Sequence, residues 1–134
     1  MKEIYDSNLY SYVKKYKLIK RNKVLFLSDK YSYYYDEKEL KGIKTIVHLK
    51  KLNEIKYLNN AIKDLCNILK KNYIFCGRFV DNKSLNYYKR FFEFLNTTRS
   101  LSQRSVTSRL AFHNFKIINM TEINGITYFY AKKL

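Results

Sequence analysis

Five polar residues fall where two apolar stretches of strand length come to an end. They are candidates for a ligand pocket, because ligands of parallel α/β sheets bind outside the carboxyl ends of the strands: His48, Lys50, Asn53, Asp81 and Asn82. A histidine and an aspartate at neighbouring strand ends could act as a base and its orienting group in proton abstraction from a hydroxyl. The alternative is structural, with His48 as a partly buried polar residue and Asp81–Asn82 as a helix cap. We therefore predict a possible pocket and assign no catalytic residue.

Basic residues form a second candidate site, for anions. The sequence has 27 Lys plus Arg against 11 Asp plus Glu, a formal net charge of +16. The densest basic group contains no acid and is the predicted anion-binding tract: Lys14, Lys15, Lys17, Lys20, Arg21 and Lys23. With a tyrosine cluster at 31–35 that could stack single-stranded bases, this tract makes nucleic-acid binding an alternative function. Against it, A- and T-rich codons also supply lysine, and a charged run on a helix is commonly a solvated face.

A smaller basic group, Arg99, Arg104 and Arg109, could contact phosphate, although solvated surface is the simpler interpretation. The sequence has too few suitable residues for a metal site or a catalytic nucleophile. With two cysteines and two histidines, we expect neither a zinc site of ordinary spacing nor a disulfide framework, and hence no metal. Cys66 and Cys76 are expected to act as small hydrophobes. The sequence contains no Gly-x-Ser-x-Gly turn, which argues against acyl transfer.

The spacing of apolar residues predicts alternating helices and strands. The predicted helices cover 7–18, 54–71, 84–95 and 102–113, and the predicted strands cover 23–28, 43–49, 73–80, 115–122 and 126–132. Strand, helix and strand over 43–80 predict a right-handed crossover with a parallel pair. Asn124–Gly125 predicts a tight hairpin turn. The expected fold is α/β: a truncated Rossmann-like parallel sheet with helices on both faces and a C-terminal antiparallel hairpin, in one domain, 1–134.

Capping residues and apolar stripes refine these helices. Asn53 is predicted to cap the helix of 54–71, and the Ser102 hydroxyl to bond the backbone at Ser105. In the first helix we expect one apolar stripe, formed by Leu9, Val13 and Tyr16. In the helix of 102–113 we expect three residues to face inward: Val106, Leu110 and Phe112.

Three stretches in chain order are predicted to form a helix, a strand and a hairpin: Leu58–Asn72, Tyr73–Val80 and Leu110–Lys132. Their order resembles the carboxyl-terminal half of class I S-adenosylmethionine-dependent methyltransferases, in which a parallel sheet ends in a reversed strand from a terminal hairpin. The likeness covers 43–134. His48–Ile55 and Ser100–Gln103 are also similar to methyltransferase-like domains encoded with bacterial exopolysaccharide and lipopolysaccharide assembly genes. This resemblance implies a cell-envelope polysaccharide context, with a sugar or nucleotide-sugar substrate if any activity survives.

The sequence departs from these methyltransferases at the cofactor site. That site needs a Gly-rich turn after the first strand, where the backbone approaches the ligand, and an acid at the end of the second. Gly42, Gly77 and Gly125 are the only glycines and lie too far apart to form such a turn. The chain is also short by one or two βα units, so we interpret 23–49 as a remnant. We expect no cofactor on the isolated chain, and S-adenosylmethionine only if a partner completes the site.

These observations favour a degenerate methyltransferase-like domain, a non-catalytic accessory or scaffold protein in cell-envelope polysaccharide biosynthesis. The alternatives are the basic nucleic-acid-binding protein and a methyltransferase completed by a partner chain or a second copy. Missing strands would leave a bare sheet edge, so we expect a homodimer or a covering partner there, or the first helix. No apolar run approaches the length of a membrane span, and the first residues lack a signal-peptide pattern, which predicts a cytoplasmic protein.

Overall fold

Helices and strands alternate along most of the chain that the computed structural model describes, which is residues 7–18, 24–27, 43–81 and 100–134. The elements are α1 (Ser7–Lys15), β1 (Val24–Leu27), β2 (Thr45–His48), the 3₁₀ turn η2 (Leu52–Glu54), α2 (Leu58–Ile68), β3 (Ile74–Val80), α4 (Gln103–Phe112), β4 (Phe115–Ile123) and β5 (Ile126–Lys133). The predicted helix of 84–95 lies outside the described residues. No helix in the described ranges combines the length and hydropathy that a bilayer span requires.

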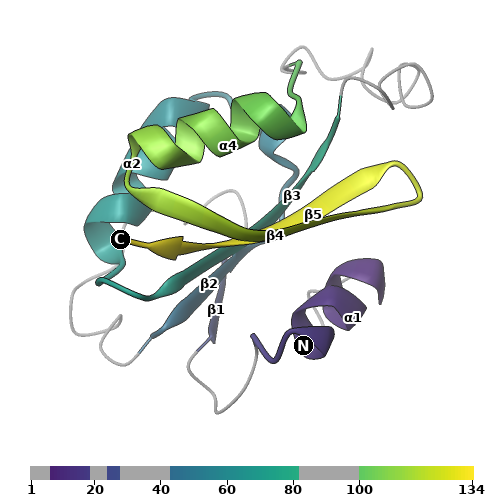
Figure 1. Cartoon of the computed structure of the whole chain (residues 1–134), viewed down its shortest axis with the longest axis horizontal. Helices are drawn as coiled ribbons and strands as arrows, with labels where there is room; N and C mark the ends of the chain where they lie inside the picture. Colours follow the sequence, from purple (N-terminus) through teal and green to yellow (C-terminus); the bar gives the residue numbers. More distant parts are fainter. Residues whose placement is uncertain (1–6, 19–23, 28–42, 82–99) are drawn as a thin grey trace.

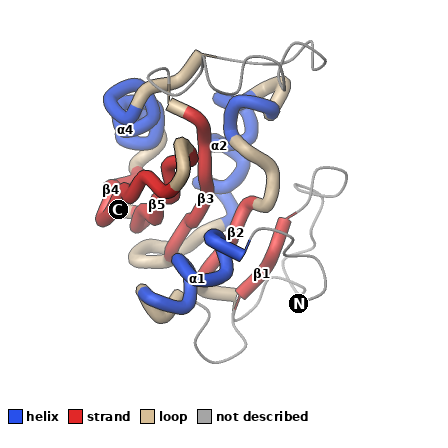
Figure 2. The backbone as a smooth tube through the Cα atoms, turned by 90° about the vertical axis from the view of Figure 1, so that its right-hand side faces the viewer, coloured by secondary structure: helices blue, strands red, loops and turns tan. Residues whose placement is uncertain are grey.

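The strands form one mixed sheet in the order β1-β2-β3-β5-β4. Figure 2 shows this order from β1 on the right to β4 on the left. The pairs β1–β2 and β2–β3 are parallel, whereas β5 runs antiparallel to both β3 and β4. Every residue of β2 is buried, as expected for a parallel strand between two helix layers. The predicted parallel sheet with a reversed strand from a hairpin is confirmed.

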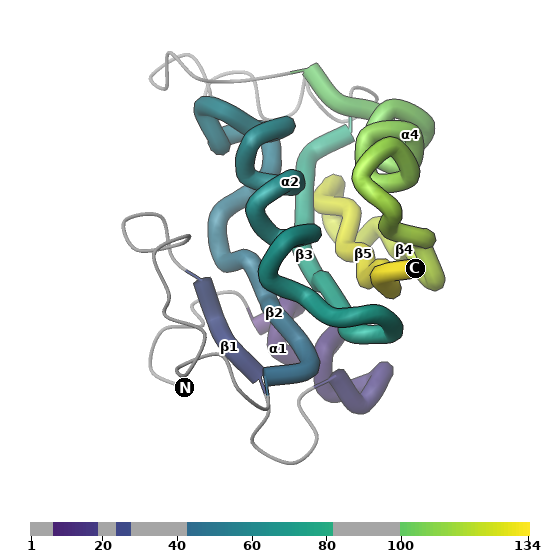
Figure 3. Tube along the Cα trace, turned by 90° about the vertical axis from the view of Figure 1, so that its left-hand side faces the viewer, coloured from purple at the N-terminus to yellow at the C-terminus, as the bar shows by residue number. Residues whose placement is uncertain are grey.

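Helices cover both faces of this sheet, again as predicted (Figures 1 and 3). On one face α2 and α4 pack over Phe75, Phe79 and Phe129 from the central strands. On the other face α1 packs over Val47, Cys76 and Tyr128. Successive residues of a strand point to opposite faces, so Phe75 and Cys76 belong to different cores. Because α1 packs on a face, the first helix, which was one of the expected covers, does not cover the β1 edge, and a homodimer or covering partner there stays a prediction.

The C-terminal hairpin turns at the dipeptide that predicted it. The φ angles of Asn124 and Gly125 are 53° and 83°. Both are positive, as this tight turn requires. The β4–β5 register shifts once, between Ile117 and Asn119, so the intervening Ile118 has no partner in the ladder and is 44% exposed.

Two predictions about α2 and α4 are wrong. The helix predicted over 54–71 begins only at Leu58, with Tyr57 at its N-cap and no side-chain cap. Phe112, expected to face inward, is 83% exposed. It lies two positions after the buried Leu110, on nearly the opposite side of the helix, so both side chains cannot face the sheet. The predicted capping at the start of α4 is confirmed, since Ser102 Oγ accepts a hydrogen bond from the Ser105 amide at 3.0 Å.

Candidate functional site

The carboxyl end of β2 carries the first two residues of the predicted pocket. His48 is 1% exposed, and its Nδ1 lies 3.2 Å from both the amide nitrogen and the carbonyl oxygen of Lys50. One ring nitrogen is therefore engaged with the turn that follows the strand. The imidazole is held against this turn, which fixes its orientation at the edge of the sheet.

Asn53 ties this turn to the end of β3. Its side chain donates to the Val80 carbonyl oxygen at 2.9 Å and accepts from the Val80 amide at 2.7 Å. Both bonds are buried, and Asn53 itself is fully buried. The side-chain amide thus satisfies two main-chain groups at the end of the strand. Contrary to the prediction, Asn53 does not cap α2, because it lies in η2 and α2 begins only at Leu58.

Asp81 directly follows β3, at the carboxyl ends of the parallel strands. It is 3% exposed and forms an isolated parallel bridge with Leu101. Its Oδ2 accepts from the Gln103 amide at 2.9 Å, next to the capping box of Ser102 and Ser105. Asp81 therefore binds the first turn of α4, whereas its predicted role as a cap of the helix of 84–95 falls outside the described residues. Asn82 lies outside the described residues.

Arg78 also holds this edge together, and the sequence analysis missed it. Its Nη2 and Nε donate to the Leu49 carbonyl oxygen at 2.6 and 3.2 Å, which bridges β3 to the chain leaving β2. The signal was present, because a lone arginine in the apolar stretch Ile-Phe-Cys-Gly-Arg-Phe-Val must find an acceptor. Side chains at this edge therefore bind main chain, and a ligand role for His48, Lys50, Asn53 and Asp81 stays a prediction.

The described glycines do not fit a cofactor cradle. A Cβ on Gly77 would lie 2.9 Å from Cζ and 3.1 Å from Cε1 of the Phe129 ring, so Gly77 makes room for sheet packing in the middle of β3. Gly125 makes the hairpin turn. Gly42 lies outside the described residues and is the only glycine between β1 and β2. No group of three metal-ligating His, Cys, Asp or Glu side chains occurs in the described ranges.

Two titratable groups are buried where α1 packs on the sheet, Tyr12 from α1 and Cys76 from β3. Burial raises the pKa of the free Cys76 thiol well above its ordinary value. Burial also raises the pKa of Tyr12, and the neighbouring Cys76, Tyr16 and Tyr130 raise it further. The Tyr12 hydroxyl donates to Asn119 Oδ1 at 2.8 Å, which links α1 to β4. Both groups are therefore held in their protonated forms and belong to the core.

The basic tract runs along α1 and beyond it. Lys14, Lys15 and Lys17 are exposed, and Lys17, two residues past the helix, has a positive φ. Lys15 Nζ lies 5.5 Å from the centroid of the Tyr16 ring. Lys20, Arg21 and Lys23 lie outside the described residues, so anion or nucleic-acid binding by this tract stays a prediction.

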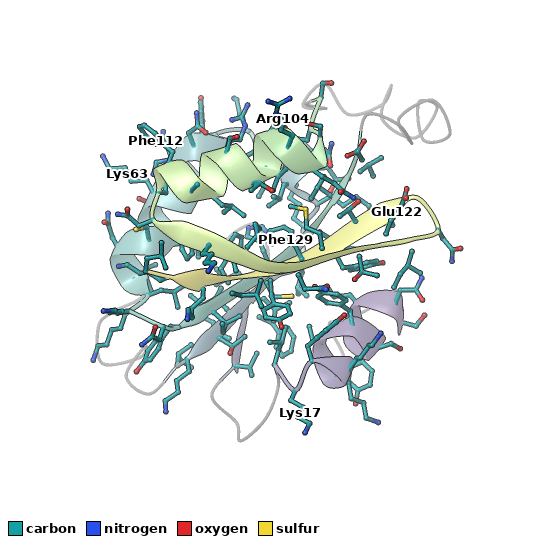
Figure 4. All side chains as sticks on the ribbon, in the orientation of Figure 1. Lys17, Lys63, Arg104, Phe112, Glu122 and Phe129 are labelled. Carbon is teal, nitrogen blue, oxygen red and sulfur yellow. The ribbon has the colours of Figure 1, made fainter. Side chains whose placement is uncertain are left out.

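A groove of about 770 Å³ opens between α2 and α4, on the side of these helices away from the sheet. Its lining comprises Asn59, Asn60, Lys63, Ser102, Arg104, Ser105, Ser108, Arg109, Phe112 and His113. Arg109 Nη1 donates to Asn59 Oδ1 at 2.9 Å and so bridges the two helices. Figure 4 shows Lys63, Arg104 and Phe112 pointing outward on this side, and Lys17 on the opposite side of the molecule. The sequence grouped Arg104 with Arg109 but gave no sign of the groove.

No protein-family model matches this sequence, and no curated protein matches it. The fold, in contrast, is widely shared. A Thermotoga maritima S-adenosylmethionine-dependent methyltransferase, possibly a histamine N-methyltransferase, superposes with a TM-score of 0.56 and 15% identity over 68% of this chain and 56% of its own. The putative methyltransferase complexed with the Trm112 activator of Haloferax volcanii superposes with a TM-score of 0.60 and 6% identity, over 67% of this chain and 53% of its own. Magnesium protoporphyrin IX methyltransferase of Synechocystis, with bound SAH, superposes with a TM-score of 0.51 and 14% identity, over 69% of this chain and 45% of its own.

The chain has a methyltransferase-like fold. It spans about half the length of these structures, between 45% and 56% of each. At such low identities the likeness concerns the fold alone, because one fold hosts many unrelated functions. The activity of the chain must therefore be argued from its own residues.

Proposed function

We propose that this chain is a non-catalytic, methyltransferase-like scaffold that works by binding a partner protein. One observation carries the proposal: the described glycines serve sheet packing and a hairpin turn, whereas the cofactor of this fold class needs glycine where the backbone approaches it. Asn53 and Asp81 support the same conclusion, because their polar atoms bind main chain at the edge where a ligand would lie.

The proposal includes a cellular context and a domain assignment. We propose that the chain corresponds to the carboxyl-terminal half of a class I methyltransferase and forms one domain, 1–134. The resemblance of His48–Ile55 and Ser100–Gln103 to domains encoded with exopolysaccharide and lipopolysaccharide genes supports a role in cell-envelope polysaccharide assembly, on the cytoplasmic side.

Calorimetric titration with S-adenosylmethionine and S-adenosylhomocysteine tests the proposal. We expect no saturable heat from either compound, because no described glycine supplies the close backbone approach that their site requires. The Synechocystis methyltransferase, whose structure holds SAH, serves as the positive control. Saturable binding to this chain alone would overturn the non-catalytic assignment and favour an enzymatic function.

A second candidate is a methyltransferase completed by another chain. The Haloferax complex favours it, because that methyltransferase is bound to an activator protein, and so does the half-length match to each structure above. In this case the partner, or a second copy covering the edge strand β1, would supply the missing glycine turn. Sedimentation of the purified chain tests self-association, and titration of the dimer with S-adenosylhomocysteine distinguishes the two candidates.

A further inference from the structure

The groove between α2 and α4 is chemically one-sided. Its lining contains three cations, Lys63, Arg104 and Arg109, and no acid. Five of the other seven lining residues are asparagines or serines, and carbon atoms contribute much of the exposed surface. The side chains of Lys63 and Arg104 are exposed, so their charges are available to a partner at the rim. A surface of this kind is complementary to a negatively charged ligand with hydrogen-bonding groups.

Phe112 adds an apolar anchor at one end of the groove. The ring is 83% exposed, the highest value among the large hydrophobic side chains in the described ranges. His113 packs edge-on against it, with ring centroids 5.1 Å apart and an interplanar angle of 86°. An exposed aromatic ring beside a groove with charged rims can anchor an apolar side chain of a partner, because a few residues carry most of the binding energy of an interface.

The two helices that form the groove are fixed from below. At the start of α4, Asp81 and Ser102 accept from the Gln103 and Ser105 amides. At the end of α2, Lys133 Nζ donates to the carbonyl oxygens of Cys66 and Leu69, the latter at 2.7 Å. The groove is therefore preformed, which lowers the entropy lost on binding.

We propose that this groove docks an acidic, amphipathic segment of a partner protein. Carboxylates of the segment pair with Lys63 and Arg104 at the rim, and an apolar side chain packs against Phe112. Asn59 and Asn60 lie where they can bond the main chain of the segment. This inference rests on the proposed function, since a scaffold needs a partner, and the net charge of +16 speeds the encounter with an acidic one.

The lining favours a protein segment over single-stranded nucleic acid. Nucleic-acid grooves of this type stack successive bases on several aromatic rings. Among the described lining residues, Phe112 carries the only benzene ring, and His113 contacts it edge-on. The α4 amides that would bind a phosphate at a helix N-terminus include those of Gln103 and Ser105, which Asp81 and Ser102 already occupy.

Fluorescence anisotropy with a labelled peptide tests the inference. The probe is a synthetic peptide in which glutamates alternate with leucine and phenylalanine. It is compared with a glutamine-for-glutamate version and a labelled oligothymidine. The groove variant is Lys63→Glu with Arg104→Glu, and its charge-matched control is Lys44→Glu with Lys116→Glu, two exposed lysines outside both the groove lining and the basic tract. Phe112→Ser tests the apolar anchor, and thermal unfolding of each variant verifies that it folds.

We expect the groove variant to lose about tenfold or more of its peptide affinity, and Phe112→Ser several-fold, while the control changes by less than about threefold. Equal losses in groove variant and control would show that net charge alone binds the peptide and would overturn the inference. An absence of peptide binding would also overturn it. So would a groove variant that loses more affinity for oligothymidine than for the peptide. The same variants are also titrated with S-adenosylhomocysteine, whose site in this fold class lies at the strand ends and not on the helices. The peptide result therefore tests the docking groove, and the S-adenosylhomocysteine result tests the non-catalytic assignment.

Discussion

Asn53 provides the sharpest test of how the edge at the strand ends is built. Asn53→Ala removes both hydrogen bonds to Val80 and leaves a buried amide and a buried carbonyl oxygen without their partner. Each unsatisfied main-chain group costs about 1–3 kcal/mol, so with two such groups we expect the free energy of unfolding to fall by about 2–6 kcal/mol. The melting temperature should fall by about 3–5 °C for each kcal/mol.

Urea unfolding followed by circular dichroism measures this change, with Asn60→Ala as the matched control. Asn60 is exposed on α2. Its replacement by alanine should change stability by less than about 0.5 kcal/mol, as is usual for surface substitutions. Asn53→Asp is the finer probe, because it keeps an acceptor for the Val80 amide but places a carboxylate oxygen against the Val80 carbonyl. If Asn53→Ala costs no more than Asn60→Ala, the two main-chain bonds do not hold this edge together and the reasoning fails.

Two further predictions concern the core. Gly77→Ala should destabilise the protein by about 1–3 kcal/mol, because the new Cβ meets the Phe129 ring at 2.9 Å, and Phe129→Leu should relieve part of this cost in the double variant. The unfolding free energy should also fall as the pH rises above the ordinary pKa of a thiol, because the unfolded Cys76 ionises there and the buried one does not. One such group lowers the unfolding free energy by up to about 1.4 kcal/mol per pH unit. Urea midpoints between pH 7 and 9.5 measure this slope.

Clear outcomes would contradict these two predictions. A stabilising Gly77→Ala would mean that the gain in strand propensity exceeds the clash, and that the glycine is not needed for packing. For the pH dependence, Cys76→Ala is the control, since it removes the thiol and should flatten the slope between pH 8.5 and 9.5. An unchanged slope would assign the loss of stability to other groups.

The sequence predicted those features that depend on neighbouring residues. Asn124–Gly125 needs only its own backbone to turn, and Ser102 needs only the amide three residues later, so both predictions were confirmed. Asn53 was interpreted as a cap for the same local reason, but its partner is Val80, 27 residues away. Local patterns contain no information about such a partner, which only the pairing of β2 with β3 brings near.

The candidate site divides in the same way. The strand-end residues were found by position, since the carboxyl ends of parallel strands meet at one edge. The groove was not found, because it depends on two helices, α2 and α4, that are separated by a strand and lie side by side only in the folded sheet (Figure 3). Phe112 was assigned to the core on hydrophobicity alone, against the helical angle that separates it from Leu110.

The position of β5 sets an order on the assembly of the sheet during synthesis. β5 comes last along the chain among the described strands, yet it lies between β3 and β4. Until residues 126–133 leave the ribosome, β3 therefore lacks one neighbour, and Phe75 and Phe79 lack the Phe129 ring they pack against. The tight turn lets β4 and β5 pair locally before they dock. A growing chain that stalls before this hairpin exposes the unpaired edge of β3. Unpaired strand edges promote aggregation unless a chaperone binds them first.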